Sequence, residues 1–190
     1  MELQHVNVKI YVEGDLQVDP GQLIELFHEW VSQQVADELL IDVADYWHVP
    51  AGPGVVVVGY EADYAMDNGG GQYGMLYNRK APLDGDNQSR LRQALGAAAA
   101  ACRRLEEAFH GDGALRFSRD EFAIIINDRG LAPNSEETLD ACRPDLEAFL
   151  KSSLGHSEFT VERQSDDPRF RFGVVVRSGQ PFDLEALVGG

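Results

Sequence analysis

Basic residues are scarce in this chain of 190 residues, which carries 16 lysines and arginines against 32 aspartates and glutamates. None of the basic residues lies between Ile10 and Asn78, where twelve acidic residues give a net charge of −12. Proteins that hold nucleic acid need clustered lysine and arginine to neutralise phosphates, and anionic membranes attract similar patches. The charge distribution therefore argues against nucleic-acid and membrane partners. A high net charge of −16 also keeps a protein soluble.

Cysteine is rare as well, with only Cys102 and Cys142, each on the apolar side of a predicted helix. We expect both to be buried thiols, because their spacing provides neither a zinc site nor a disulfide framework. No apolar run approaches the ~20 residues that span a bilayer. The N-terminus lacks the basic start and apolar stretch of a signal peptide. These absences predict a cytoplasmic protein.

Hydrophobic alternation of period two marks the predicted strands, because successive side chains of a strand point to opposite faces. The clearest case is the first, where Val6, Val8, Ile10 and Val12 alternate with polar residues. Eight strands are predicted, and they cover residues 5–13, 39–48, 54–64, 73–79, 115–118, 122–127, 159–163 and 170–176.

Three helices are predicted from capping residues followed by apolar side chains at helical spacing. The first begins at Asp19-Pro20 and runs to about residue 34. The others begin at Asp86 or Asn87 and at Asn134 or Ser135, and they run to about residues 110 and 154. Pro144 is expected to break or kink the third helix.

The order of these elements predicts an α+β fold, a two-layer sandwich with a mostly antiparallel sheet and three helices on one face. Its first part is similar to a ferredoxin-like βαββαβ unit with an extra strand, and a further αββ segment extends it. We expect one domain over residues 1–180. Residues 181–190 are predicted to form a flexible tail.

A turn segment, VPAGPG at residues 49–54, predicts a hairpin in which facing residue numbers sum to 103, to within one or two positions. This register places Asp42 opposite Glu61. The face expected to be core contains Leu39, Ile41, Val43, Trp47, Val56, Val58, Tyr60, Ala62 and Tyr64, with Asp45 as a misfit. The other face contains Asp42, Ala44, Tyr46, His48, Val55, Val57, Gly59, Glu61 and Asp63.

Two facing carboxylates repel each other and require compensation. Water alone is sufficient if this face of the sheet is open. Alternatively Arg79, on a strand that also places Tyr77 beside Glu61, reaches across to the pair. A third possibility is a hard cation such as Mg²⁺ or Ca²⁺, with Asp42, Glu61 and Asp63 as candidate ligands.

An enzyme would use Asp42 or Glu61 as a general acid or base, with His48 and Tyr46 as polar neighbours. Against this hypothesis, the chain lacks the sequence motifs of nucleophile elbows, phosphate loops, dinucleotide folds and kinases, and no cofactor is expected.

A binding module would use the same acidic, tyrosine-bearing face, with Tyr46, Asp63, Tyr77 and Arg79 as contact residues. Its partner would be another protein, or a second copy in a homodimer. In a homodimer, the acidic stretch would meet the arginines of the last strand, Arg169, Arg171 and Arg177. Of the two hypotheses, the sequence favours a non-catalytic binding or assembly module.

The C-terminal Gly189-Gly190 resembles the end of ubiquitin-like carrier proteins, which implies a carrier role; a docking tail is the alternative. The segments DELLIDVADY, LYNRKA and INDRGLAPN are similar to a family of bacterial proteins without an assigned activity. That similarity therefore implies no function.

Overall fold

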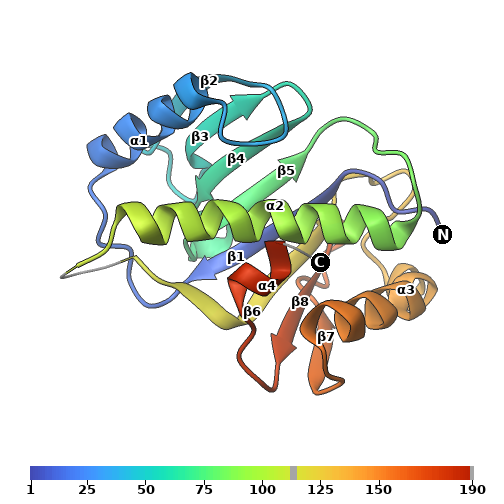
Figure 1. Cartoon of the computed structure of the whole chain (residues 1–190). Coiled ribbons are helices and arrows are strands. Elements are labelled where there is room, and N and C mark those ends of the chain that lie inside the picture. Colours follow the sequence, from blue (N-terminus) through green and yellow to red (C-terminus); the bar gives the residue numbers. More distant parts are fainter. Residues whose placement is uncertain (112–114, 189–190) are drawn as a thin grey trace.

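Eight strands in one sheet form the frame of the protein, and the computed structural model describes residues 1–111 and 115–188 (Figure 1). The strands are β1 (Val6–Val12), β2 (Leu40–Tyr46), β3 (Gly54–Gly59), β4 (Ala62–Asp67), β5 (Gly74–Arg79), β6 (Phe117–Ile126), β7 (Phe159–Arg163) and β8 (Phe172–Ser178). They lie in the order β2-β3-β4-β5-β1-β6-β8-β7, and all neighbours are antiparallel.

The helices pack on one face of this sheet, so the predicted two-layer α+β sandwich with an antiparallel sheet is confirmed (Figure 1). They are α1 (Pro20–Gln33), α2 (Asn87–Ala108), α3 (Glu136–Leu154) and the short α4 (Leu184–Val188). None of the helices within the described residues is long and apolar enough to cross a membrane. Cys102 and Cys142 are buried free thiols, as predicted.

Side-chain caps start the three long helices where the sequence predicts them. Asp19 accepts hydrogen bonds from the backbone N–H groups of Gly21 and Gln22 at the start of α1. Asp86 and Ser135 cap α2 and α3 in the same way. These bonds satisfy N–H groups that have no partner inside a helix.

Pro144 lies inside α3, which is continuous from Glu136 to Leu154, so the break, one of the two effects expected of it, does not occur. Its ring lies on the exposed side of the helix. Cys142 and Leu146, on either side of it, are both buried in the core. Burial of one continuous apolar stripe therefore outweighs the local cost of a proline.

Two strand boundaries also differ from the prediction. Residues 54–64 form two strands, β3 and β4, joined by a tight turn at Tyr60 and Glu61. Gly59 permits this turn, because a β-carbon at that position would collide with the Ala62 carbonyl. In contrast, residues 117–126 form the single strand β6 rather than a hairpin, with a register shift against β1 between Ile10 and Val12.

The last described residues, up to residue 188, pack against the rest of the protein and do not form a free tail. Phe182, Leu184 and Leu187 are buried, and α4 lies against α2 beside Gly96. The expected limit of the domain at residue 180 is therefore too early, because these three side chains belong to the core. Gly189 and Gly190, on which the carrier hypothesis depends, lie outside the described residues.

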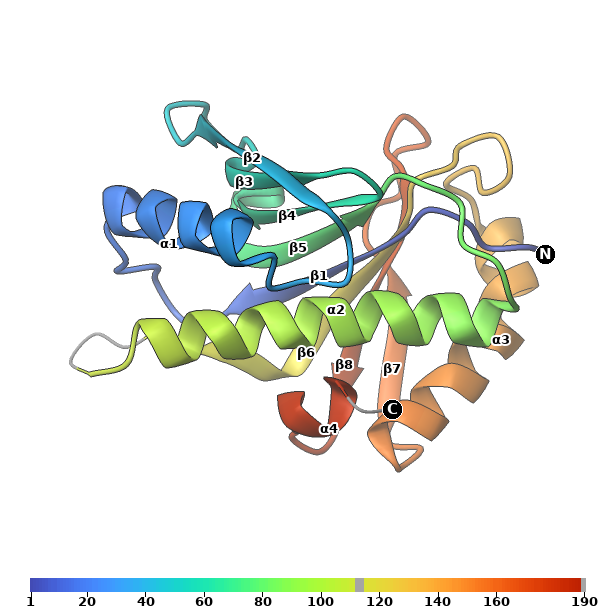
Figure 2. The ribbon, with the colours of Figure 1, turned by 45° about the horizontal axis from the view of Figure 1, so that its top comes forward.

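The connection between α1 and β2 determines where the candidate site lies. β1 is an inner strand and β2 is at the edge of the sheet, so α1 carries the chain across one face. Figure 2 shows the segment after α1 passing beside the middle of α2 before it enters β2. Residues 34–39 are therefore held between a helix and the sheet.

Candidate functional site

Asp42 and Glu61, the carboxylates expected to face each other, are not a cross-strand pair. Asp42 lies opposite Val58, and its Oδ1 accepts a hydrogen bond from the N–H of Val43 (2.8 Å). Glu61 lies beyond the end of β3, in the turn to β4. The predicted register is wrong, since facing residue numbers over most of the hairpin sum to 100 (Val43 with Val57).

Two features of the hairpin cause this error. A bulge between Leu40 and Asp42 turns Leu40 inward and leaves Ile41 exposed, so the expected core face of β2 is interrupted. The four consecutive valines of β3 have no alternation, and the structure buries Val55 and Val57 rather than Val56 and Val58.

The side chains predicted to adjoin the two carboxylates are not gathered around them. Tyr77 lies opposite Tyr64, and Arg79 lies opposite Ala62. Asp63 forms an ion pair with Lys80 (2.7 Å). Tyr46 and His48 are exposed near the end of β2.

Within the described residues, no group of three or more His, Cys, Asp or Glu side chains could hold a metal ion. Asp42, Glu61 and Asp63 therefore do not form the cation site that the sequence left as a third possibility. The close Asp42–Glu61 pair that the enzyme hypothesis requires is not formed across the hairpin either.

The centre of the helix-free face is less open than expected. Asn7, Lys9 and Tyr11 of β1 do point to this face, but each of them is buried. The Lys9 ammonium donates to Asp67 Oδ2 (2.7 Å) and to the carbonyl of Gly69 (2.9 Å). Burial lowers the pKa of Lys9, and Asp67 opposes that shift. These groups are occupied within the protein, so a partner cannot reach them.

A different carboxylate, that of Glu38, is the centre of the polar cluster that the fold assembles. Its Oε1 accepts from the Tyr77 hydroxyl (2.6 Å) and from the Gln93 amide (3.1 Å), and its Oε2 accepts from the Tyr64 hydroxyl (2.8 Å). The Arg79 guanidinium lies 3.6 Å from Oε1. The side chain of Glu38 is only 5% exposed, and these donors compensate for its burial.

Both tyrosines of this cluster are held in the protonated form. Burial is the largest cause that raises the pKa of Tyr64 and of Tyr77, and the negative charge of Glu38 and the hydrogen bond to it raise both pKa values further. A tyrosine that keeps its proton so firmly is a poor general acid. The network is therefore suited to fixing the α1–β2 connection against β4, β5 and α2.

Sequence reasoning missed Glu38 because it lies in a connection rather than in a strand or helix. The signal that pointed to it is the pair of tyrosines, since a buried tyrosine hydroxyl needs a hydrogen-bond partner. Which acidic residue supplies that partner depends on the path of the chain after α1.

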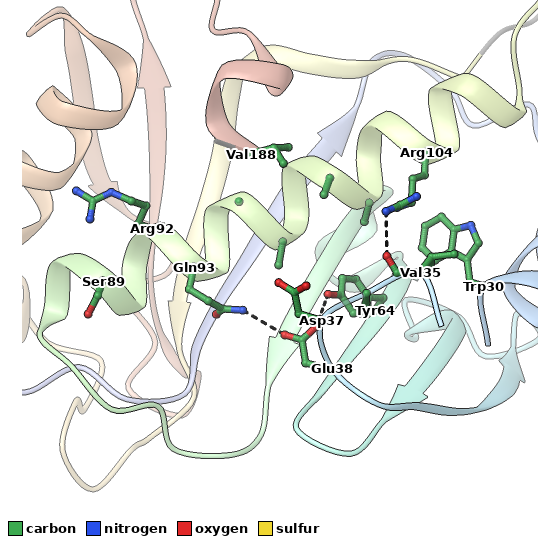
Figure 3. Close-up of a pocket in the computed structure, with 15 residues that line it drawn as sticks. Trp30, Val35, Asp37, Glu38, Tyr64, Ser89, Arg92, Gln93, Arg104 and Val188 are labelled. Carbon is green, nitrogen blue, oxygen red and sulfur yellow. Dashed lines mark hydrogen bonds between the residues drawn. The ribbon is translucent and has the colours of Figure 1, made fainter. Parts of the chain in front are cut away.

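A pocket of about 460 Å³ lies beside this network, between α2 and the α1–β2 connection (Figure 3). Its α2 wall is made of small side chains, and Val35, Ala36 and Val188 add apolar surface. Charged and polar residues border it: Asp37, Glu38, Tyr64, Ser89, Arg92, Gln93 and Arg104. Figure 3 shows the Arg104 side chain turned toward the Val35 carbonyl, to which it donates a hydrogen bond (2.9 Å).

A second surface feature is the outer edge of the sheet at β2. Leu39, Ile41 and Tyr46 are 57%, 53% and 46% exposed, and Tyr60, whose N–H bonds to the Leu39 carbonyl, is 70% exposed. The acidic side chains of Asp42 and Asp45 are exposed along the same strand. We call these six residues the β2 edge patch.

Neither comparison with known proteins identifies this chain: no protein-family model matches it, and no curated protein matches it.

Proposed function

We propose that this protein is a non-catalytic binding module, and that its β2 edge patch captures an extended protein segment rich in basic and apolar residues. The observation that carries the proposal is the concentration of large exposed apolar side chains on the edge strand, where Ile41 and Tyr46 lie, and directly beside it, at Leu39 and Tyr60. Exposed apolar patches bordered by polar residues are typical of interaction sites. An edge strand also offers backbone groups to which an added strand can bond.

The charge of the patch supports a basic partner. Asp42 and Asp45 accompany the apolar side chains, and no lysine or arginine occurs between Ile10 and Asn78. Opposite charges on a partner would accelerate association and exclude acidic competitors. A second copy of this chain, pairing β2 with β2, would instead bring these aspartates together.

Asp42 supports the same proposal through its backbone contact. Its carboxylate occupies the N–H of Val43, which limits pairing of this edge with other β2 strands. A lysine or arginine of an incoming segment would attract that carboxylate. The Val43 N–H would then be available for a main-chain bond.

The test measures binding of two eight-residue peptides by fluorescence anisotropy. One peptide alternates lysine with valine, and the other has glutamate in place of lysine. We expect saturable binding of the lysine–valine peptide alone. In NMR spectra, this peptide should change the chemical shifts of the backbone amides of β2. The Ile41→Thr and Tyr60→Ser variants should each weaken binding by about tenfold, which is about 1.4 kcal/mol.

Phe170→Ser is the matched control, because Phe170 is 59% exposed but lies before β8, away from the patch. Asp42→Asn keeps an oxygen for the Val43 N–H and removes the charge, so it should weaken binding only at low salt. Equal binding of both peptides, or equal losses in Phe170→Ser and Ile41→Thr, would refute the proposal.

A further inference from the structure

A second recognition site, separate from the β2 edge patch in its chemistry, is indicated by two of the charged side chains that border the α2 pocket. Its volume of about 460 Å³ lies within the range of small-molecule sites. Arg104 and Asp37 border it from opposite sides, one on α2 and the other on the α1–β2 connection (Figure 3).

Arg104 has no carboxylate partner among the described residues, although acidic residues outnumber basic ones by 32 to 16. Its only bond there is from one terminal nitrogen to the Val35 carbonyl (2.9 Å). The other guanidinium N–H groups remain available. Arginine binds carboxylates in a planar, bidentate geometry, so these groups suit an anionic group of a ligand.

Asp37 provides the opposite charge. No ion pair or side-chain hydrogen bond involves its carboxylate within residues 1–111 and 115–188, and its side chain is exposed in the pocket. Figure 3 shows this carboxylate directed toward the small side chains of α2. Glu38, the neighbouring acid, already accepts three hydrogen bonds from protein donors. A ligand cation would therefore meet Asp37 rather than Glu38.

The surface between these charges is apolar and permits close approach. Gly96, Ala97 and Ala100 form the exposed side of α2 there, and Val35 and Ala36 lie across from them. An apolar side chain of a ligand would fill this space and be removed from water.

We infer that this pocket binds a zwitterion with an apolar body, either a free amino acid or a short peptide. Its carboxylate pairs with Arg104 and its ammonium with Asp37. This occupant satisfies Arg104, Asp37 and the apolar wall together. The other arginine of the lining, Arg92, lies near Asp86, whose pKa it helps to lower. A simple fatty acid would leave Asp37 facing an anion, and a simple amine would leave Arg104 unpaired.

The experiment compares leucine, dileucine and trileucine by isothermal titration calorimetry, which distinguishes a free amino acid from a peptide. Blocked forms of the best binder, N-acetylated or C-amidated, each lack one charge. We expect each block to weaken binding by about tenfold or more, because one ion pair is lost. Equal affinity of the blocked forms would overturn the inference, as would the absence of binding by all three zwitterions.

Three variants assign the roles. Arg104→Gln should make binding insensitive to C-amidation, and Asp37→Asn should make it insensitive to N-acetylation, because each removes the protein half of one pair. Ala97→Leu should abolish binding by filling the pocket. Arg103→Gln is the control, since Arg103 pairs with Glu107 and does not line the pocket.

Circular dichroism verifies that each variant is folded, so a loss of binding reports on the pocket. The inference is supported if Arg104→Gln binds the free and C-amidated ligands equally well and Asp37→Asn binds the free and N-acetylated ligands equally well. It is overturned if the variants discriminate between these forms as strongly as the wild type does. Because the lysine–valine peptide and the zwitterions are separate probes, failure of one site is distinguishable from failure of the other.

Discussion

Glu38 illustrates how a single side chain connects distant parts of this protein. Its carboxylate accepts hydrogen bonds from Tyr64, Tyr77 and Gln93, which are 26, 39 and 55 positions away in sequence. A buried carboxylate is costly unless its oxygens are bonded. Each donor therefore contributes to stability by compensating for that cost, in addition to its own packing.

Removing one of these donors should destabilise the protein. We expect Tyr64→Phe or Tyr77→Phe to lower the free energy of unfolding by about 1.5–3 kcal/mol, because a bond to a buried charge is lost. Urea unfolding followed by circular dichroism measures the change. Tyr60→Phe, at a position that is 70% exposed, is the control and should change stability by less than about 0.5 kcal/mol. Equal effects at positions 60 and 77 would contradict this account of the network.

The same tyrosines predict a loss of stability at alkaline pH. Their pKa values are raised above the ordinary value of 10.0 in the folded protein, so the unfolded chain releases these protons first. Stability is therefore retained below pH 10 and falls as the pH rises above it. Replacing Tyr77 by Phe should reduce this slope by up to about 1.4 kcal/mol per pH unit.

Urea unfolding of the wild type and Tyr77→Phe between pH 8 and 11 tests this expectation. Lys9 acts in the opposite direction. Its pKa is lowered in the folded protein, so below pH 10.5 the unfolded chain binds more protons at this position, and stability rises with pH. Because Lys9 is present in both proteins, its contribution cancels in the comparison. Identical slopes would show that Tyr77 is not protected by the fold.

At the level of elements, α3 combines a strong apolar stripe with an unfavourable residue. Proline inside a helix has no N–H to donate and crowds the preceding turn. The buried side chains of Cys142, Leu146, Phe149 and Leu150 nevertheless hold the helix together along its length. Packing therefore determines this helix more strongly than local propensity does.

Pro144→Ala should accordingly stabilise the protein. The intrinsic gain in a helix interior is about 3 kcal/mol, and the freer unfolded chain offsets about 0.4–1 kcal/mol of it. Since α3 is already adapted to proline, we expect a net gain of about 1–2 kcal/mol in urea unfolding. Ala148→Pro, at another exposed position of the same helix, should have the opposite effect. A less stable Pro144→Ala protein would mean that the proline fits α3 without strain.

At the level of the whole molecule, the net charge of −16 acts against the compact state. Like charges repel over distances that salt shortens, from a Debye length of about 30 Å at 0.01 M to about 3 Å at 1 M. The basic side chains are partly used within the fold. Arg177 pairs with Glu121 and Glu162, and Arg169 pairs with Asp167.

Salt should therefore stabilise this protein. We expect the melting temperature to rise between 0.01 and 0.5 M NaCl, as measured by calorimetry, because self-repulsion is screened. A variant with Asp15→Asn and Glu25→Gln, both exposed in the acidic stretch, should show a smaller rise. A melting temperature that falls with salt would mean that the ion pairs outweigh the repulsion.

The homodimer suggested by the charge distribution stays a prediction. With Arg169 and Arg177 paired within the chain, Arg171 is the exposed arginine left to meet an acidic stretch of a second copy. Such a dimer should dissociate as salt increases, which light scattering at several concentrations would detect. A monomer under all conditions would exclude it.

The sequence by itself determined the class of the fold and the starts of the three long helices, because both depend on short-range signals. Asp19 and Ser135 cap helices within a few residues of themselves, and the alternation of Val6 to Val12 marks the face of β1 that packs in the main core with the helices. Such signals do not depend on how distant segments meet.

Only the tertiary structure decided the register of β2 and β3 and the composition of the candidate sites. Four consecutive valines carry no alternation, and the bulge between Leu40 and Asp42 interrupts the inward-facing series of β2, so that Leu40 is buried while Leu39 and Ile41 are exposed. Glu38 and the α2 pocket exist because the segment after α1 crosses the sheet and lies against α2. Contacts between residues this far apart are selected by the burial of the whole core, and local sequence patterns do not encode that selection.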